Sequence, residues 1–394
     1  MAQIHIRKIR KRTVGNTCIV SACVAGDAVW FSAENIDLAT SPEAFLSAFL
    51  IPAQLRKDRL VAQTPVCETW LKNTTELSVI TNGWWQRKVK PTEVPIKEPA
   101  RRKRFFRKTA LFFTAGVDSF HTLFRHPRRI HGLVNVHGFD IALENETRQR
   151  EAEASYRAVA RSRRIPLIQI RTNLREHPYF SKTNWNFTHG GAMAGVAHLL
   201  GSTYQNFLLS SSTRRDDPRI WGSTWQIDPL WSSYTTNFSS WGEHLSRAEK
   251  MEEIADMPLV RDHLRVCWQS KDAAANCGIC PKCTRTMVSL AWAGKLEGLK
   301  HRFVMNPWLP EVVATWKSTP ILSIAELDPV LRDPERLPDP LRSAVIAHRE
   351  KLLADLEARL ARARSLEAEL PSPRARPTAE LGGVTYSHEK STSL

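Results

Sequence analysis

Four cysteines in the second half of the chain have the residue type and spacing of a metal site. Three follow a CxxCxxC spacing, and nine residues separate the first from that run. Zinc prefers thiolate ligands, and four of them fill its tetrahedral coordination without leaving an open position. We therefore expect a structural Zn²⁺ ion; an iron–sulfur cluster and buried cysteines without a metal are the alternatives. The cysteines are Cys267, Cys277, Cys280 and Cys283.

A second candidate site is the segment 114–119, which lies between an apolar strand-like run and a helix-like run. Small residues let backbone N–H groups approach phosphate oxygens, and the N-terminal end of a helix favours an anion. The hydroxyls of Thr114 and Ser119 can donate hydrogen bonds to phosphate oxygens. The carboxylate of Asp118 can bind magnesium or cap the helix. An ordinary strand-to-helix turn is the alternative. The residues are Thr114, Ala115, Gly116, Val117, Asp118 and Ser119.

A third group of residues could bind a planar substrate. The segment 221–241 contains four tryptophans, together with Asp228 and several hydroxyl residues. Trp225 and Trp231 would stack on a heterocycle or base, and Asp228 would accept hydrogen bonds from its N–H groups. A core packed with large aromatic side chains is the alternative.

A parallel sheet is expected to position these residues. Strand-like and helix-like runs alternate from about residue 109, which predicts a doubly wound α/β fold of the Rossmann type. Such folds bind ligands at the carboxyl ends of their strands. His137 and Asp140, at the end of the second strand, are therefore candidate contacts to the cofactor and the substrate, and a core role is the alternative for His137. The predicted strands are 109–115, 132–140, 166–172 and 205–213.

The run FTAGVDSF resembles the SGGxDS loop of the ATP-pyrophosphatase (PP-loop) superfamily, with Thr114 for its serine and Ala115 for its first glycine. The cysteine cluster behind it resembles the zinc site of 7-cyano-7-deazaguanine synthase. The resemblance covers roughly residues 108–300. It implies an adenine nucleotide alpha hydrolase fold that binds ATP and Mg²⁺ at the loop. It also implies that Arg247 and Lys250 reach the phosphates, whereas an exposed helix face is the alternative.

The leading hypothesis is an enzyme that adenylates a small-molecule carboxylate or carbonyl and releases pyrophosphate, after which a nitrogen nucleophile displaces AMP. Asp118, Arg247 and Lys250 would be its catalytic residues, acting through position and charge. The first alternative is an enzyme that uses the same loop to modify tRNA or another nucleic acid. The second is a catalytically inactive nucleotide-binding protein, in which Ala115 marks the loss of activity.

The formal net charge of +16 favours contact with a phosphate backbone where the positive charges gather in space. Basic runs occur at 7–12, 101–108 and 125–129, and the region from Arg359 onward is rich in arginine. A nucleic-acid partner is therefore a hypothesis, and solvated or linker charges are the alternative.

The length of 394 residues and the apolar content of 42% allow one large and one smaller domain. No apolar run is long enough for a membrane span, and the N-terminus lacks the apolar part of a secretory signal, so we expect a cytoplasmic protein without membrane contact.

The first domain or the long C-terminal helix could bind a protein partner or a second copy of the chain. The expected parts are a small α+β accessory domain at 1–98, a basic linker at 99–109, the PP-loop domain with its zinc site at 110–303, a mainly helical extension at 304–370 and a disordered tail at 371–394.

Overall fold

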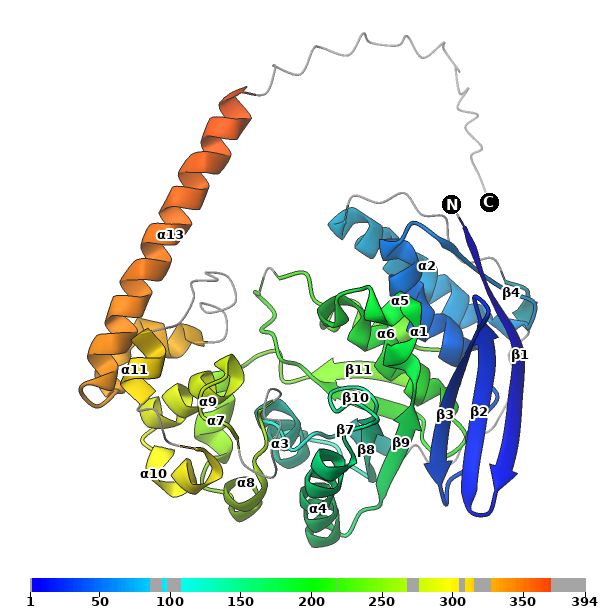
Figure 1. Cartoon of the computed structure of the whole chain (residues 1–394), viewed down its shortest axis with the longest axis horizontal. Coiled ribbons are helices and arrows are strands. Elements are labelled where there is room, and N and C mark those ends of the chain that lie inside the picture. Colours follow the sequence, from blue (N-terminus) through cyan, green and yellow to red (C-terminus); the bar gives the residue numbers. More distant parts are fainter. Residues whose placement is uncertain are drawn as a thin grey trace, which may run out of the picture.

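The fold is α/β and contains one large mixed sheet (Figure 1). The predicted linker up to residue 107 and the predicted tail lie outside the described residues. No helix in the described part of the chain is long and apolar enough to cross a membrane. The computed structural model describes residues 2–85, 94–97, 108–217, 219–267, 276–304, 309–314 and 327–369.

The large sheet has nine strands in the order β11-β10-β7-β8-β9-β3-β2-β1-β4. The strands from β11 to β9 are parallel, β9, β3, β2 and β1 pair antiparallel, and β4 is parallel to β1. Two short strands, β5 (Val66–Cys67) and β6 (Ile96–Lys97), form a separate pair. The strands of the large sheet are β1 (Gln3–Val14), β2 (Thr17–Val24), β3 (Asp27–Glu34), β4 (Arg59–Ala62), β7 (Thr109–Phe112), β8 (Gly132–His137), β9 (Leu167–Thr172), β10 (Asn206–Ser210) and β11 (Asn237–Trp241).

The parallel half of the sheet is buried on both faces. Along β7 and the residue after it, Ala110 and Phe112 belong to one hydrophobic core, and Leu111 and Phe113 belong to another. Continuous apolar runs of this kind are typical of parallel strands that helices cover on both sides. The structure confirms an α/β fold with a mostly parallel sheet, and it confirms the four predicted strands as β7, β8, β9 and β10.

Helices from distant parts of the chain cover the sheet. One core includes residues of α1 and α6, and the other includes residues of α3, α4, α7 and α9. The longer helices are α1 (Pro42–Leu55), α2 (Glu68–Trp84), α3 (Val117–Arg125), α4 (Glu146–Arg163), α6 (Trp185–Leu199), α7 (Arg247–Ile254), α9 (Pro281–Trp292) and α13 (Leu341–Glu369). The shorter ones are α5 (Pro178–Ser181), α8 (Pro258–His263), α10 (Leu296–Leu299) and α11 (Leu309–Ala314).

Residues 1–98, expected to form a separate accessory domain, contribute four strands to the same sheet. β3 pairs antiparallel with β9, where Ser32 lies opposite Arg171. α1 packs against α6, and both helices share one hydrophobic core with β1, β2 and β3. Strand pairs that are far apart in sequence leave no local pattern, which is why the sequence suggested a boundary near residue 100.

The helix α13 projects away from the rest of the molecule (Figure 1). Its first part packs on the body through the buried side chains of Leu341, Val345 and Leu352. The spacing of Leu353, Leu356 and Leu360 predicts an apolar face that docks on the core or on a partner. Leu353 and Leu360 are each 49% exposed. The contact with the body therefore uses a different face of the helix from the one that the leucine spacing indicates.

Candidate nucleotide and metal sites

The predicted phosphate loop forms the turn between β7 and α3. Ala115 has a φ of +55°, a left-handed backbone conformation that glycine adopts more readily. Gly116 is the N-cap residue of α3, and no side chain among the described residues caps this helix end. The Ser119 hydroxyl instead donates to the Gly116 carbonyl at 3.1 Å. The first N–H groups of α3 are therefore available to an anion.

Lys250 and Arg247 converge on Asp118 in this turn. α7, which begins with a capping box after β11, carries both basic residues. Lys250 Nζ lies 3.3 Å from Asp118 Oδ1 and donates to the Ser211 carbonyl at 2.6 Å. Arg247 Nη1 lies 3.6 Å from Asp118 Oδ2. The three residues predicted to be catalytic thus lie together, although they come from two distant helices.

Burial and charge act against each other at this site. Burial favours a higher pKa for the Asp118 carboxyl, but Arg247 and Lys250 outweigh it and hold that pKa below its usual range. Burial lowers the pKa of the Lys250 amine, and Asp118 opposes that change. Lys282, at the start of α9, adds positive potential at Asp118. One carboxylate therefore faces several cations, an environment that suits a phosphate ligand.

His121 forms a wall of this site that the sequence analysis missed. Its ring stacks on Trp241 with the centroids 5.2 Å apart, and its Nε2 lies 3.2 Å from Glu253 Oε2. Burial and the charge of Lys250 lower the pKa of His121 to about 4, so the imidazole is neutral at physiological pH. Its position three residues after Asp118 on the same helix face could have indicated it.

A small cavity adjoins the phosphate turn at the carboxyl ends of β7 and β8. Its volume is about 30 Å³, enough for one water molecule. Thr114 and Asp140, both predicted ligand contacts, line it. His137, predicted to contact the cofactor, is 2% exposed, and its Nε2 lies 3.1 Å from the Ala142 carbonyl oxygen. The histidine therefore holds the turn after β8.

A larger cavity, of about 320 Å³, lies beside the loop that follows β10. Trp225, predicted to stack on a substrate, lines it and is 37% exposed. The guanidinium carbon of Arg215 lies 4.8 Å from the centroid of the Trp225 ring. Trp231, in contrast, is fully buried in the core and contributes no face to this cavity.

Asp228 is fully buried behind the wall of the larger cavity. Its backbone N–H donates to the carbonyl of Thr224, which lines that cavity. Its Oδ2 accepts a 2.7 Å hydrogen bond from Ser223, and its Oδ1 has no hydrogen-bond partner among the described residues. Burial raises the pKa of Asp228 to about 7, although the hydroxyls of Ser223 and Ser240 act in the opposite direction.

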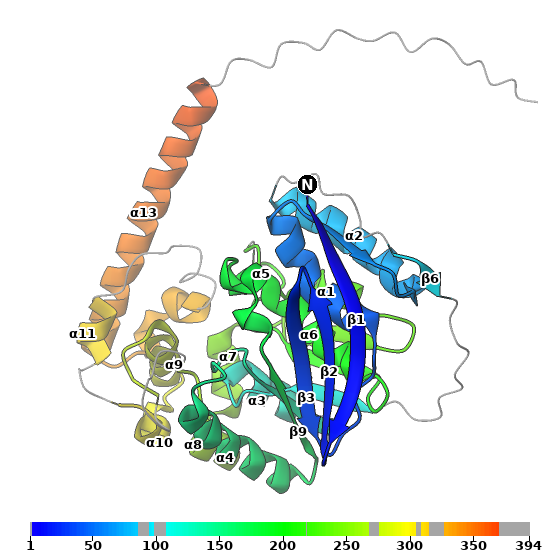
Figure 2. The same ribbon diagram turned by 45° about the vertical axis from the view of Figure 1, so that its right-hand side comes forward.

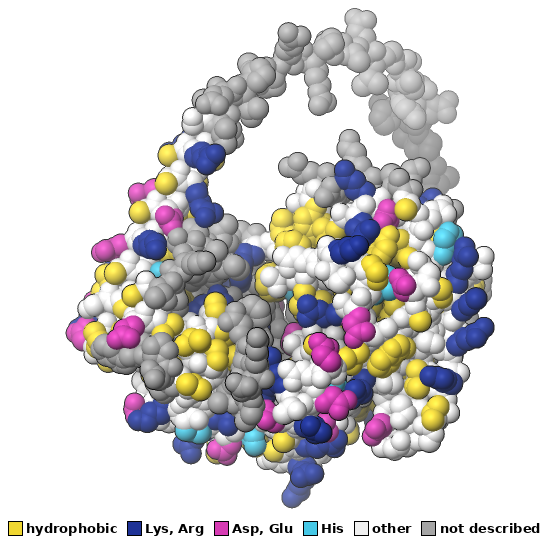
Figure 3. Space-filling model, viewed as in Figure 1, with side chains coloured by type: hydrophobic (Ala, Val, Ile, Leu, Met, Phe, Trp, Pro, Cys, Tyr) yellow, Lys and Arg dark blue, Asp and Glu magenta, His cyan; other side chains and the backbone are white. Residues whose placement is uncertain are grey.

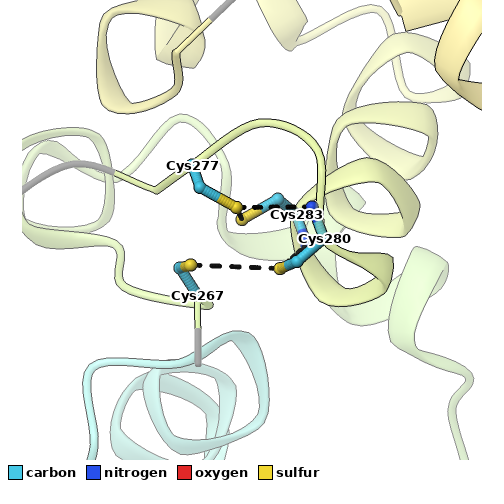
Figure 4. A group of neighbouring side chains, drawn as sticks. All are labelled: Cys267, Cys277, Cys280 and Cys283. Carbon is cyan, nitrogen blue, oxygen red and sulfur yellow. Dashed lines mark hydrogen bonds between the residues drawn. The ribbon is translucent and has the colours of Figure 1, made fainter. Parts of the chain in front are cut away.

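The four predicted metal ligands lie together, and Figure 4 shows their side chains. The sulfur atoms of Cys267, Cys277, Cys280 and Cys283 all lie within 4.8 Å of one another. The Cys277–Cys283 and Cys267–Cys280 sulfur distances are both 3.9 Å. Tetrahedral zinc with bonds of about 2.3 Å places its sulfur ligands about 3.8 Å apart. The cluster could therefore hold a metal ion such as zinc.

The loop that carries the cysteines has a constrained backbone. Gly278 has a φ of +76°, and a Cβ atom there would lie 1.8 Å from the Val304 carbonyl oxygen. Only glycine fits this position. The backbone N–H of Cys280 lies 3.3 Å from the sulfur of Cys277 and donates to it. The loop is therefore shaped to keep the CxxCxxC sulfurs on one side.

Asn276 was not predicted, yet it connects the two parts of the cysteine site. The residue is 2% exposed. Its Oδ1 accepts hydrogen bonds from the N–H groups of Val266 and Cys267 at 2.8 and 3.0 Å. Its Nδ2 donates to the carbonyls of Leu264 and Arg302 at 3.2 and 3.0 Å. This side chain therefore positions Cys267 relative to the cysteines that follow.

Residues 264–267 join the metal site to the phosphate turn. The backbone N–H of Arg265 donates to the Ala115 carbonyl at 2.8 Å. The Arg265 carbonyl oxygen lies 3.7 Å from the position that a Cβ atom on Gly116 would occupy. A segment that ends in one candidate metal ligand, Cys267, therefore packs directly on the turn where an anion would bind.

Comparison of the chain with protein-family models, curated proteins and solved structures finds no match.

Proposed function

We propose that this protein is an adenylating enzyme of the ATP-pyrophosphatase type, which binds ATP at residues 114–119 and releases pyrophosphate. The observation that carries the proposal is the convergence of Lys250 and Arg247 on Asp118, beside the N-terminal end of α3. Burying an ammonium group costs free energy unless the charge is paired. Because one carboxylate faces two cations here, positive charge remains for the phosphates.

Each group at the turn would have a distinct role. The N–H groups of α3 and the hydroxyls of Thr114 and Ser119 would donate to phosphate oxygens. A lysine ammonium has three N–H donors, and Asp118 and the Ser211 carbonyl use two of those of Lys250. The third would contact the α-phosphate or the leaving pyrophosphate. A fixed positive charge in a poorly hydrated site stabilises negative charge that develops during the reaction.

Asp118 and the four cysteines would hold the two metals. Magnesium prefers carboxylate and phosphate oxygens, and the low pKa of Asp118 keeps that carboxylate ionised. Magnesium would neutralise part of the triphosphate charge. Zinc with four thiolate ligands has no open position for a substrate, so its role would be structural. Through Arg265, the zinc loop would support the phosphate turn.

The substrate would be a small-molecule carboxylate or carbonyl compound, and a nitrogen nucleophile would displace AMP from its adenylate. This chemistry follows from the resemblance to 7-cyano-7-deazaguanine synthase. The larger cavity, of about 320 Å³, is our candidate for the substrate site. Small-molecule sites range from about 300 to 1,000 Å³. Trp225 would offer it an apolar surface.

The test is pyrophosphate release from ATP and Mg²⁺ by the full chain, screened over small carboxylic acids, nitrogen heterocycles and RNA. We expect release that depends on one substrate class and that falls by about 100-fold or more in Lys250→Ala. Lys295→Ala, which breaks a surface ion pair with Asp256, is the matched control. ATP binding without pyrophosphate release would instead support an inactive nucleotide-binding protein. Absence of ATP binding would refute both the adenylating enzyme and the inactive nucleotide-binding protein.

A further inference from the structure

The strands β1, β2 and β3 present a broad face to solvent (Figure 2). Along β2, buried residues alternate with partly exposed ones. The buried residues pack with α1 in the hydrophobic core. The partly exposed residues mark the outward face and are Thr17, Ile19, Ser21 and Cys23.

Three arginines of β1 project from this outward face. Residues that lie opposite each other in an antiparallel pair project to the same side of the sheet. The opposing pairs are Arg7–Cys23, Arg10–Ser21 and Arg12–Ile19. A bulge between Arg7 and Arg10 shifts the register, and Lys8 within it has a φ of +54°. In a regular strand, residues three apart project to opposite faces, so the bulge brings Arg7 into line with the other two arginines.

Trp30 is the aromatic residue of this face, and its side chain is partly exposed. Ser21 lies opposite Trp30 in β3 and opposite Arg10 in β1. Adjacent strands are about 4.8 Å apart, so the backbones at Arg10 and Trp30 are about 10 Å apart across the sheet. The next row across the sheet ends at Arg171 in β9. The face therefore combines a central aromatic ring with guanidinium groups around it.

The arginines of β1 keep their positive charge available. None of the ion pairs within the described ranges involves Arg7, Arg10 or Arg12. Lys11, which lies opposite the buried Val20 and so projects to the other side, pairs with Asp37. Figure 3 shows dark-blue basic side chains in a row at the edge of the molecule where β1 lies. The β1 edge of the outward face thus offers a strip of positive charge that is unpaired among the described residues, whereas Arg171 on β9 pairs with Glu146.

We propose that the outward face of β1, β2 and β3 binds single-stranded nucleic acid, with its phosphates on the three arginines and one base stacked on Trp30. Guanidinium groups make charge-assisted hydrogen bonds with phosphate oxygens. Aromatic side chains on an open sheet stack on unpaired bases, whereas a duplex keeps its bases inside the helix. The arginines are spaced about 7 Å apart along the strand, which forms a linear row for an extended backbone.

This surface is distinct from the nucleotide site. Four strands, β8, β9, β3 and β2, separate β7 from β1 in the sheet. At about 4.8 Å per strand, the two strands are roughly 24 Å apart. Nucleic-acid binding here therefore does not depend on the proposed adenylation.

The test is fluorescence anisotropy of the full chain with labelled RNA and DNA single strands of about 12 nucleotides, and with a duplex of the same sequence. Three phosphate contacts predict that affinity falls roughly 20-fold between 50 and 200 mM salt. The combined variant Arg7→Gln, Arg10→Gln, Arg12→Gln should lose most of this salt dependence. Trp30→Ala should weaken binding on the order of ten-fold, and Trp30→Phe should restore most of it.

A charge-matched control comes from the other end of the molecule. The combined variant Lys295→Gln, Lys300→Gln, Arg332→Gln removes the same charge from surface ion pairs and should bind like the unmodified chain. An equal loss of single-strand affinity in both triple variants would show a non-specific charge effect and overturn the proposal. Tighter binding of the duplex than of either single strand, or unchanged binding by Trp30→Ala, would also overturn it.

Discussion

The backbone N–H of Arg265 donates a 2.8 Å hydrogen bond to the carbonyl of Ala115, and Cys267 follows two residues later. One short segment therefore links the cysteine cluster to the turn that would bind phosphate. Whatever fixes the position of Cys267 also fixes the backbone that packs on Ala115. A metal ion held by the cysteines would in this way be coupled to the shape of the turn at Ala115, which it would not contact.

Removal of the metal should weaken nucleotide binding as well as stability. We expect stoichiometric zinc in the purified chain, and a lower Tm and a higher Kd for ATP after chelation or in Cys280→Ser. Metal analysis, thermal unfolding and calorimetric titration measure these quantities. Cys67→Ser is the control, because Cys67 lies outside the cluster. Unchanged ATP affinity in the metal-free protein would contradict the coupling, and stoichiometric iron would contradict zinc.

Asn276→Ala should disturb the metal site without removing a ligand. The N–H groups of Val266 and Cys267 would lose their buried acceptor. We expect the free energy of unfolding to fall by about 1–3 kcal/mol and metal affinity to fall about 10- to 100-fold. Asn276→Asp keeps the acceptor and should lose less affinity. Competition with a chromophoric chelator measures the metal affinity. Equal metal affinities for the unmodified chain, Asn276→Ala and Asn276→Asp would refute the positioning role of Asn276.

Lys250→Met should destabilise the fold, because it leaves the largely buried Asp118 carboxylate, whose side chain is 14% exposed, with one cation fewer. Breaking a buried ion pair costs about 3–5 kcal/mol, and Arg247 remains to offset part of that cost. We expect a loss of about 3 kcal/mol in urea unfolding. The double variant Asp118→Asn, Lys250→Met should lose less than the sum of the two single variants. Additive losses would show that the two groups do not interact.

Ala115→Gly should preserve or increase stability. The left-handed φ of Ala115 costs about 1 kcal/mol relative to glycine, and glycine loses a similar amount through the greater freedom of the unfolded chain. We expect a gain between zero and about 1 kcal/mol. Ala115→Val should destabilise strongly, since a β-branched residue is a poor fit to positive φ. Urea unfolding compares the three proteins, and a more stable valine variant would contradict the observed backbone conformation.

Asp228→Asn should change how stability depends on pH. The pKa of Asp228 is about 7 in the folded protein and about 4 when unfolded. The folded state therefore binds more protons between these values, so the stability linked to Asp228 is present below about pH 4 and lost as pH rises through 7. Between pH 5 and 8, the unmodified chain should lose roughly 3 kcal/mol relative to the variant. Parallel pH profiles for both proteins would refute the shifted pKa.

The elements around the phosphate turn could be predicted because their patterns are local. The buried run at β7 and the small residues after it define a strand and a turn within a dozen positions. The cysteine spacing is equally local. Asp118 and Lys250 could be named as separate candidates. The 3.3 Å distance between Lys250 Nζ and Asp118 Oδ1, however, depends on the packing of α7 against α3, which the sequence does not show.

Other features could not be read from the sequence, because they depend on contacts between distant segments. β11 lies in a tryptophan-rich segment. Its sequence, NFSSW, mixes an asparagine and two serines with aromatic residues, so it lacks the continuous apolar run of β7. The burial of Trp231 and the four hydrogen bonds of Asn276 depend on which segments pack around them. Neither residue type by itself distinguishes a ligand contact from a structural one.

The antiparallel pairing of β3 with β9 also has a consequence for biosynthesis. The ribosome completes β3 well before it makes β9, so the nascent chain carries an unpaired strand edge while the intervening segments emerge. An exposed edge of this kind can pair with the edge of a neighbouring nascent chain. Rapid translation of the intervening segments, or chaperone binding during that interval, would reduce such misassembly, and a fragment cut near residue 100 would keep the bare edge permanently.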